Sequence, residues 1–470
     1  MSSKRSRILA LQRCSSNQSA LARELCVLRK DPDLLDVVTS RFVLHRSSDA
    51  LWAQLGQTHI LQVDDGDGDV NDFTWYTLSL RRVLEFLVAD SDEFRARMCQ
   101  LYRREPCTPN SPWDLIFNFD EATPGAVLNL NNQRKMWTVM VTLKQFGPQV
   151  LQHEAAWLPI ACLRSNKAKD VQGGFSGASR HLMRDWFVQQ PRLQEEGLLL
   201  PIGPNGRSVL VFIKFGNTLS DEDALKKFWS GKGASGIQPC WKCWVSRLGP
   251  DGTSLREFDA TATMLDIRCG NSANFQMIDD KCRYVQANVL ARSHGNVQKK
   301  QLHELQQAYG LTYNPHGILW DSSLRGIVLP QSCSRYDAAH CFFCNGMVNE
   351  ELDHLLERLE QICKVGFAEL QVYCGAAWRS ATCFNGRKNK LSKIDAFTKM
   401  RANYWKSTGK FRPNASELLT LVPLIAHFLQ TVPGIAAQIP AETFSFVMLA
   451  KVEVYQLLVP ASFVYFATNV

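Results

Sequence analysis

An apolar run that ends in two carboxylates constrains the fold of this chain more than any other stretch. Residues 113–119 read Trp-Asp-Leu-Ile-Phe-Asn-Phe, and Asp120 and Glu121 follow, before a turn favoured by Pro124 and Gly125. The run predicts a buried strand. An Asp at a strand end has the rigid support that a metal ligand needs. An Asp before a turn, however, more often forms a hydrogen bond with the turn backbone. The run therefore predicts a sheet, and its function depends on acids elsewhere.

Strand patterns and helix patterns alternate through the middle of the chain. Residues 136–143 and 208–216 are rich in β-forming residues, and the second run is apolar enough for a central strand. Residues 181–190 and 221–230 have the apolar spacing of helices. Strands interleaved with helices predict an α/β core, which we place at residues 111–375.

Helical patterns dominate on both sides of this core. Residues 1–110 predict a helical N-terminal region that an Asp-rich loop at 64–70 interrupts. A helix is expected over 349–374, and residues 376–470 are expected to form a basic segment followed by helices. The apolar stripe of the 349–374 helix consists of Leu352, Leu355, Leu356, Leu359 and Ile362.

The composition is that of a globular protein in a reducing compartment. A length of 470 residues suggests about two to four domains. The 15 cysteines and an N-terminus without a signal-peptide pattern predict thiols or metal ligands in an intracellular protein, nuclear or cytoplasmic and not secreted. The apolar tail at 454–470 is short and interrupted for a membrane span, so no membrane partner is expected.

A second acidic motif, Asp221-Glu222-Asp223, follows the strand expected at 208–216. It repeats the order of strand and then acid seen at Asp120. The competing interpretation is a helix N-terminus, in which Ser220 is the cap and the helix dipole favours the acids of the first turn. Asp221 and Asp223 also form a DxD triplet, which in a nucleotide-sugar transferase would hold Mn2+ and a diphosphate.

Cysteine pairs indicate a candidate zinc site. Cys240 and Cys243 have the CxxC spacing that places two thiolates on one Zn2+ ion. A second pair, Cys341 and Cys344, follows directly after His340. The alternative is that these thiols pack in the core, as free cysteines commonly do.

The third acidic region lies at the start of the helix expected over 349–374. Glu350 and Glu351 occur there, where the helix dipole favours acids in any protein. Asp337 and His340, three positions apart, would share a helix face. A metal-dependent enzyme would use one of these acids as a third ligand, and Asp337 competes with the two glutamates.

In their order, these motifs resemble the catalytic region of CACTA-type DDE transposases and transposase-derived proteins, over about residues 110–365. The resemblance implies an RNase H-like mixed sheet with Asp120, Asp221 and Glu350 or Glu351 as catalytic carboxylates, Glu350 being preferred. It also implies Cys240, Cys243 and His340 as the accessory cysteine pair and histidine, a candidate Zn2+ site. One departure is Glu121, because plant members of the family usually have Gly after the first Asp.

The resemblance implies Mg2+ or Mn2+ as cofactor and DNA as substrate. Two metal ions held by carboxylates activate a water or a 3′-hydroxyl and stabilise the leaving oxygen at a phosphodiester. The chain is then an active enzyme from a transposable element, or a degenerate or domesticated copy. The expected partners besides DNA are a second copy of the chain or a second DNA-binding protein. Specific end recognition is either missing or supplied by that other protein.

A basic segment is the candidate DNA-binding surface. Residues 387–412 hold nine Lys and Arg against one acid, a local excess that equals the +8 of the whole chain. Tyr404 and Trp405 offer rings for base stacking. The DNA-binding candidates are Arg387, Lys388, Lys390, Lys393, Lys399, Arg401 and Lys406.

Two other classes of function remain open on the sequence alone. A non-catalytic protein would use the cysteine pair for zinc and the basic segment for nucleic acid. A nucleotide-sugar transferase would use the DxD triplet. Nicking of DNA that depends on Mg2+, bound zinc and nucleotide-sugar turnover separate these classes.

Overall fold

The computed structural model describes residues 51–64, 69–122, 135–151, 153–242, 277–337, 346–377, 396–413 and 415–451. The chain divides into two compact units, Met1–Arg335 and Tyr336–Val470. Each unit has its own elements and is described by itself. The predicted α/β class is confirmed, because the N-terminal unit contains a mixed sheet with helices and the C-terminal unit is helical where it is described.

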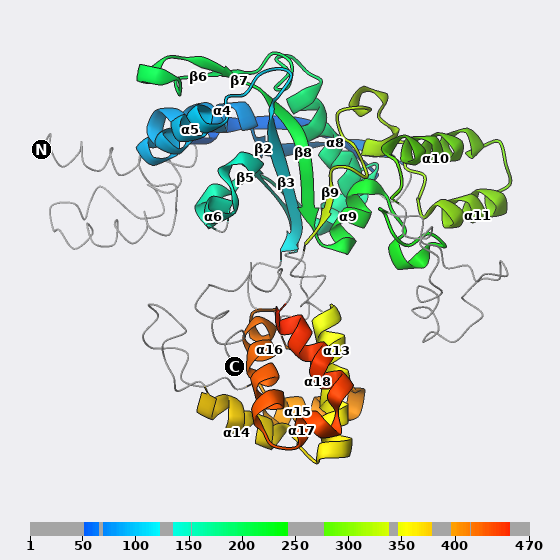
Figure 1. Cartoon of the computed structure of the whole chain (residues 1–470). Coiled ribbons are helices and arrows are strands. Elements are labelled where there is room, and N and C mark those ends of the chain that lie inside the picture. Colours follow the sequence, from blue (N-terminus) through cyan, green and yellow to red (C-terminus); the bar gives the residue numbers. More distant parts are fainter. Residues whose placement is uncertain are drawn as a thin grey trace, which may run out of the picture. The chain divides into compact units, whose positions relative to one another are not determined.

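A seven-stranded sheet organises the N-terminal unit, in the order β1-β2-β5-β4-β3-β8-β9. Figure 1 shows two of its strands, β3 and β8, side by side. β3 pairs antiparallel with β4 and parallel with β8, and β4 pairs antiparallel with β5. The strands are β1 (Gly56–Asp64), β2 (Val70–Leu78), β3 (Trp113–Ala122), β4 (Met136–Leu143), β5 (Leu158–Arg164), β8 (Ile213–Ser220) and β9 (Ser334–Tyr336). The strands expected at 113–119 and 136–143 are confirmed.

The two faces of β3 differ because side chains alternate along a strand. Phe117 and Phe119 are fully buried on one face, where both rings contact Phe228. Asn118 is half-buried and Asp120 is exposed on the other face. The buried aromatic face holds the strand in place, so that the polar face presents its residues from a rigid support.

Two helices provide the apolar partners of the sheet. α8 (Gly174–Phe187) and α9 (Glu222–Trp229) confirm the helices expected near 181–190 and 221–230. Phe175 of α8 stacks on Trp137 with ring centres 4.4 Å apart, and Phe228 of α9 stacks on Phe119 at 4.8 Å. Among its described residues, this unit also contains the longer helices α4 (Leu80–Asp90), α5 (Asp92–Arg104), α10 (Asp280–Ser293) and α11 (Lys299–Tyr309).

The expectation of a mainly helical region before residue 110 is wrong for residues 56–78. These residues form the β1–β2 hairpin, which is paired from Gly56↔Leu78 to Asp64↔Val70. His59, Leu61 and Val63 face inward while their neighbours are exposed, so the true period is two residues. Residues 1–50 lie outside the described part of the chain.

The apolar run at 208–216 is two strands rather than one. β7 (Val209–Val211) pairs with β6 (Leu198–Leu200) in a separate small sheet, and the main-sheet strand β8 begins only at Ile213. β8 continues past Phe215 to Ser220 and lies between β3 and β9, so the expected central position is confirmed. Asp221 therefore follows the end of a strand directly.

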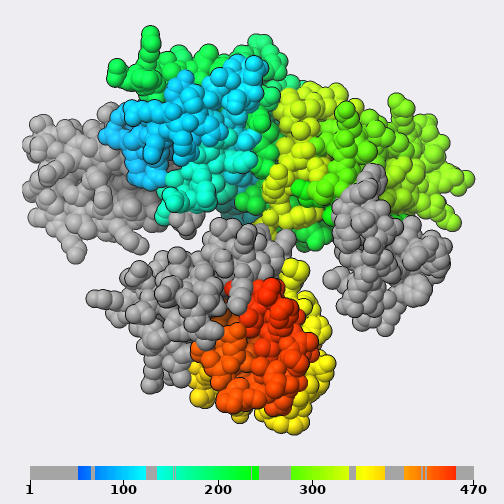
Figure 2. All heavy atoms as spheres, in the orientation of Figure 1, coloured from blue at the N-terminus to red at the C-terminus, as the bar shows by residue number. Residues whose placement is uncertain are grey.

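The C-terminal unit is built from α13 (Met347–Arg358), α14 (Phe367–Ala377), α15 (Lys399–Thr408), α16 (Ala415–Thr431), α17 (Ile435–Gln438) and α18 (Pro440–Lys451). Figure 2 shows their atoms, coloured yellow to red, packed closely together. The single helix expected over 349–374 is wrong. A π-helical turn at Leu359–Cys363 and a left-handed Lys364 (φ 56°) end α13, so Ile362 leaves the buried stripe and is 41% exposed.

Within the described residues, the helices are all too short or too polar to cross a membrane.

Candidate functional site

Asp120 lies inside β3 rather than in a turn after it, because the strand continues to Ala122. Its backbone is held by β4, where Thr138 pairs with Asp120 and its hydroxyl donates to the Asp120 carbonyl oxygen at 3.3 Å. Its exposed carboxylate accepts the Glu121 N–H at 2.7 Å. Pro124 and Gly125 lie outside the described residues.

Asp221 caps α9, which corrects the expectation that Ser220 is the cap. The Asp221 Oδ1 atom accepts the backbone N–H of Ala224 at 2.7 Å. The adjacent acids of the DxD triplet are exposed, and Asp223 lies 3.6 Å from the Lys226 ammonium. The cap fixes the orientation of the Asp221 carboxylate at the point where β8 becomes α9.

The sheet brings Asp120 and Asp221 together. β3 and β8 lie side by side (Figure 1) and run parallel, with Asn118 paired to Leu219. Continuing this register by two residues places Asp120 opposite Asp221. Ser220 bridges the strands one residue earlier: its hydroxyl donates to the Phe119 carbonyl oxygen at 2.7 Å and accepts the Phe119 N–H at 3.3 Å. Neighbouring strands lie about 4.8 Å apart, which suits two carboxylates that share a metal ion.

Glu121 belongs to the opposite face of the sheet from Asp120, because consecutive strand residues alternate. Its carboxylate lies 3.5 Å from the Lys135 ammonium. Burial acts to raise the pKa of Glu121, but the Ser165 hydroxyl and the charges of Lys227 and Lys135 outweigh it and hold the pKa below its usual value. Glu121 therefore interacts with Lys135 and Lys227 on the face of the sheet opposite to Asp120.

The donors at the strand ends fit Mg2+ or Mn2+, because carboxylate oxygens are the ligands that these hard cations prefer. Two carboxylates make an incomplete site, and no group of three His, Cys, Asp or Glu side chains is close enough to bind a metal within the described residues. Glu350 and Glu351, the acids expected to complete it, belong to the C-terminal unit.

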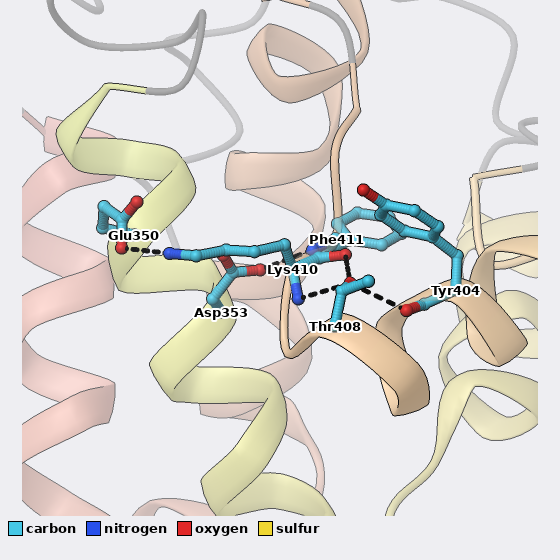
Figure 3. A network of polar contacts seen from close by, with 6 residues as sticks. All are labelled: Glu350, Asp353, Tyr404, Thr408, Lys410 and Phe411. Atoms are coloured by element: carbon cyan, nitrogen blue, oxygen red, sulfur yellow. Dashed lines mark hydrogen bonds and ion pairs between the residues drawn. The ribbon is translucent and has the colours of Figure 1, made fainter.

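Glu350 forms an ion pair with Lys410, whose Nζ atom lies 2.6 Å from Glu350 Oε2 (Figure 3). The Glu350 side chain remains 53% exposed. The hydrogen bond to Glu350 raises the pKa of Lys410, so the ammonium stays charged. Glu350 therefore helps to fasten the segment after α15 to the start of α13.

Asp353 lies beside this pair and is 7% exposed (Figure 3). Its Oδ1 atom accepts the Phe411 N–H at 2.7 Å, and its Oδ2 atom lies 3.6 Å from the Lys410 ammonium. Burial raises the pKa of Asp353, although the Phe411 N–H and Lys410 act against the shift. Glu351 is exposed, and Asp337 ends the described stretch after β9.

The candidate zinc ligands are only partly described. Cys240 is half-buried, while Cys243, His340, Cys341 and Cys344 lie outside the described residues. The structure adds Arg283, which no sequence pattern distinguishes. This residue of α10 is 1% exposed and donates to the carbonyl oxygens of Cys240 at 2.9 Å and Trp241 at 2.6 Å.

The described part of the basic segment is largely paired with acids that are distant in sequence. Arg401 makes two hydrogen bonds to Glu417, at 3.0 and 2.9 Å, and Lys406 lies 3.9 Å from Glu360. Lys399 is exposed. Arg387, Lys388, Lys390 and Lys393 lie outside the described residues.

The two aromatic residues of this segment have different surroundings. Trp405 is 8% exposed and packs in the core of the unit, so the expectation that it stacks on bases is wrong. Tyr404 is 40% exposed and keeps an accessible ring, with the Arg412 guanidinium 5.7 Å from its centre.

Comparison of this chain with protein-family models and with curated proteins found no match.

Proposed function

We propose that this chain is a transposase-derived phosphoryl transferase that acts on DNA through metal ions held by Asp120 and Asp221. The observation that supports the proposal is the parallel pairing of β3 and β8, which ends in an acid on each strand at the same edge. The strand order β5-β4-β3-β8-β9 also supports an RNase H-like core, because the β5–β4 and β4–β3 pairs are antiparallel and the β3–β8 pair is parallel.

The chain's own residues have two tasks in this proposal. Asp120 and Asp221 bind and orient the cation from a rigid sheet edge. The β4 strand fixes the backbone of Asp120, and the α9 cap fixes the orientation of the Asp221 carboxylate. Bound Mg2+ would supply the activation of the attacking oxygen and the stabilisation of the leaving oxygen.

The sequence resemblance implies a third acid, Glu350 or Glu351, and both residues belong to the C-terminal unit. Glu350 is paired with Lys410, whereas the Glu351 side chain is exposed to solvent. The Glu350→Gln and Glu351→Gln variants decide between them, since only the variant that removes a ligand abolishes cleavage.

The test is nicking of supercoiled plasmid DNA by the purified chain in Mg2+, Mn2+ or EDTA. We expect metal-dependent nicking that Asp120→Asn and Asp221→Asn each reduce by about 100-fold or more. Asp223→Asn is the matched control, because Asp223 is an exposed acid in the first turn of α9, close to Asp221 in sequence, and pairs with Lys226 at the surface. Nicking by Asp120→Asn at the parental rate would refute the assignment.

The same variants separate the other classes. A DxD nucleotide-sugar transferase would depend on Asp223 and not on Asp120, with UDP-sugar hydrolysis as the assay. A non-catalytic zinc protein would show bound zinc by mass spectrometry, lost in Cys240→Ser, and no nicking in any metal. The basic segment supports DNA as the partner, through its exposed Lys399 and Tyr404.

A further inference from the structure

The end of the β3–β8 ladder is closed by a side chain. The backbone pairing of the two strands extends to Asn118↔Leu219, and the chain then leaves the sheet to begin α9 at Glu222. Phe119 is fully buried, so its backbone N–H and C=O require partners. The Ser220 hydroxyl contacts both: it accepts from the nitrogen at 3.3 Å and lies 2.7 Å from the oxygen. The Phe119 oxygen shares the single proton of this hydroxyl with the Leu219 carbonyl oxygen, which lies 2.6 Å from the hydroxyl.

Ser220 lies where its contacts affect both acids at once. It is 3% exposed, and it precedes Asp221 directly, while its partner Phe119 precedes Asp120 directly. A change in the distance between Phe119 and Ser220 is therefore carried into the spacing of the two carboxylates. A metal ion shared between two carboxylates requires a narrow range of that spacing, because Mg2+ demands near-ideal octahedral geometry.

We propose that Ser220 is a positioning residue that sets the separation of Asp120 and Asp221 for metal binding. The inference rests on the proposed function, because it assigns to Ser220 the geometry of that same metal site. In this role Ser220 is not itself a ligand of the metal. It acts through the backbone of Phe119, as partners of metal ligands generally act by fixing the orientation of those ligands.

The chain contains a matched control for this role. Thr218 lies two residues earlier on β8 and is fully buried, and its hydroxyl donates to the Cys333 carbonyl oxygen at 3.3 Å. Its bond therefore leads to the segment before β9 and not to β3. Thr218→Val and Ser220→Ala each remove one buried hydroxyl from the same strand, but only the second variant alters the contact with β3.

The measurement is the dissociation constant for Mn2+ in the absence of DNA, determined by electron paramagnetic resonance on the full-length protein. Circular dichroism checks that each variant is folded. We expect Ser220→Ala to weaken Mn2+ binding by about 10-fold or more. Thr218→Val should keep the parental affinity, and Ser220→Thr, which retains the hydroxyl, should restore most of it. Where Ser220→Ala does not fold, Ser220→Cys gives the same comparison, because a thiol is a weak hydrogen-bonding group.

The outcomes separate this inference from the function on which it rests. Asp120→Asn and Asp221→Asn variants that bind Mn2+ like the parent, or a parent that binds none, overturn the metal site and the role of Ser220 together. Loss of binding in both Asp variants with parental binding in folded Ser220→Ala overturns the role of Ser220 alone. An equal loss in Thr218→Val also overturns it, because the effect would then belong to the strand and not to the bridge.

Discussion

Arg283 holds Trp241 in two ways: its guanidinium donates to the Trp241 carbonyl oxygen at 2.6 Å and lies 4.6 Å from the centre of the indole ring. The same group donates to Cys240 and Tyr309 carbonyl oxygens at 2.9 and 3.2 Å. A buried guanidinium thus orders the backbone at the first cysteine of the CxxC motif. The planar fork of Arg suits several carbonyl acceptors at once, which a Lys ammonium does not match.

The Arg283→Ala variant should therefore be much less stable than the parent. Its carbonyl partners would be left buried without these donors, and we expect the free energy of unfolding to fall by about 3 kcal/mol or more. Urea denaturation measures the change. The exposed Arg325, which bonds Asn288 at 2.6 Å, is the control, and Arg325→Ala should cost less than about 1 kcal/mol. Equal losses in the two variants would contradict this role.

Asp353 should affect stability through its hydrogen bond more than through its charge. Asp353→Ala removes the acceptor of the buried Phe411 N–H and should cost about 1–3 kcal/mol, whereas Asp353→Asn keeps an oxygen there and should cost less.

Because the pKa of Asp353 is raised in the folded chain, the folded state binds its proton more tightly. The stability of the parent relative to Asp353→Asn should thus fall as the pH rises from about 3.8 through the raised pKa.

The test is urea denaturation of the parent, Asp353→Ala and Asp353→Asn from pH 3.5 to 7. Glu357, an exposed acid of the same helix that bonds Gln361, provides the control substitution Glu357→Gln. If the stability of the parent relative to Asp353→Asn rose with pH, the direction of the Asp353 pKa shift would be wrong.

His59 and His181 should make the N-terminal unit sensitive to acid. Burial lowers the pKa of each imidazole to about 4, and the rings lie 6.2 Å apart between β1 and α8. The unfolded chain takes up these protons near pH 6.5, so it binds more protons than the folded chain between pH 6.5 and 4. Stability should therefore be complete above pH 6.5 and fall as the pH drops towards 4.

The His59→Gln variant should flatten this dependence, because it removes one of the two titrating rings. The urea midpoint at pH 7 and at pH 5 provides the measurement. His303 is exposed on α11, and His303→Gln should leave the dependence unchanged. The interpretation is wrong if His303→Gln flattens the profile as much as His59→Gln.

Two cations of the basic segment should behave differently towards DNA. Arg401 is engaged with Glu417, so Arg401→Gln should lower stability and change DNA affinity little. Lys399 is exposed, and Lys399→Gln should weaken DNA binding. It should also lower the slope of log affinity against log salt concentration by about one, the amount expected for one lost phosphate contact. Fluorescence anisotropy with a labelled duplex between 50 and 200 mM salt tests this. A salt slope that Lys399→Gln left unchanged would remove Lys399 from the interface.

The strands at 113–119 and 136–143 could be predicted from the sequence, whereas the β1–β2 hairpin at the edge of the sheet could not. Residues 113–119 are apolar because α8 and α9 cover one face of β3, so local composition reflects burial. The β1–β2 hairpin instead exposes Ile60 at 48% and Tyr76 at 60%, which blurs the contrast between its two faces. Its period of two is therefore weak beside the stronger helical patterns around it.

The candidate site was predictable as a set of acids but not as a geometry. Asp120 and Asp221 could be found because each follows an apolar run that forms a strand, yet their pairing depends on a parallel register between segments about one hundred residues apart. The basic segment shows the same limit. Its local charge excess ignores Glu417, Glu360 and Glu350, which only tertiary packing brings to Arg401, Lys406 and Lys410.

The β1–β2 hairpin is almost self-sufficient in its backbone hydrogen bonds. It pairs internally from Gly56 to Leu78, but it meets the rest of the sheet through one paired position, Thr77↔Ala161, and the Trp75 indole, which donates to the Cys162 carbonyl oxygen at 2.9 Å. The strands that carry Asp120 and Asp221 pair with each other and not with this hairpin. Natural variation or design can therefore change the β1–β2 hairpin at the outer edge of the sheet, while β3 and β8 keep the register that pairs Asp120 with Asp221.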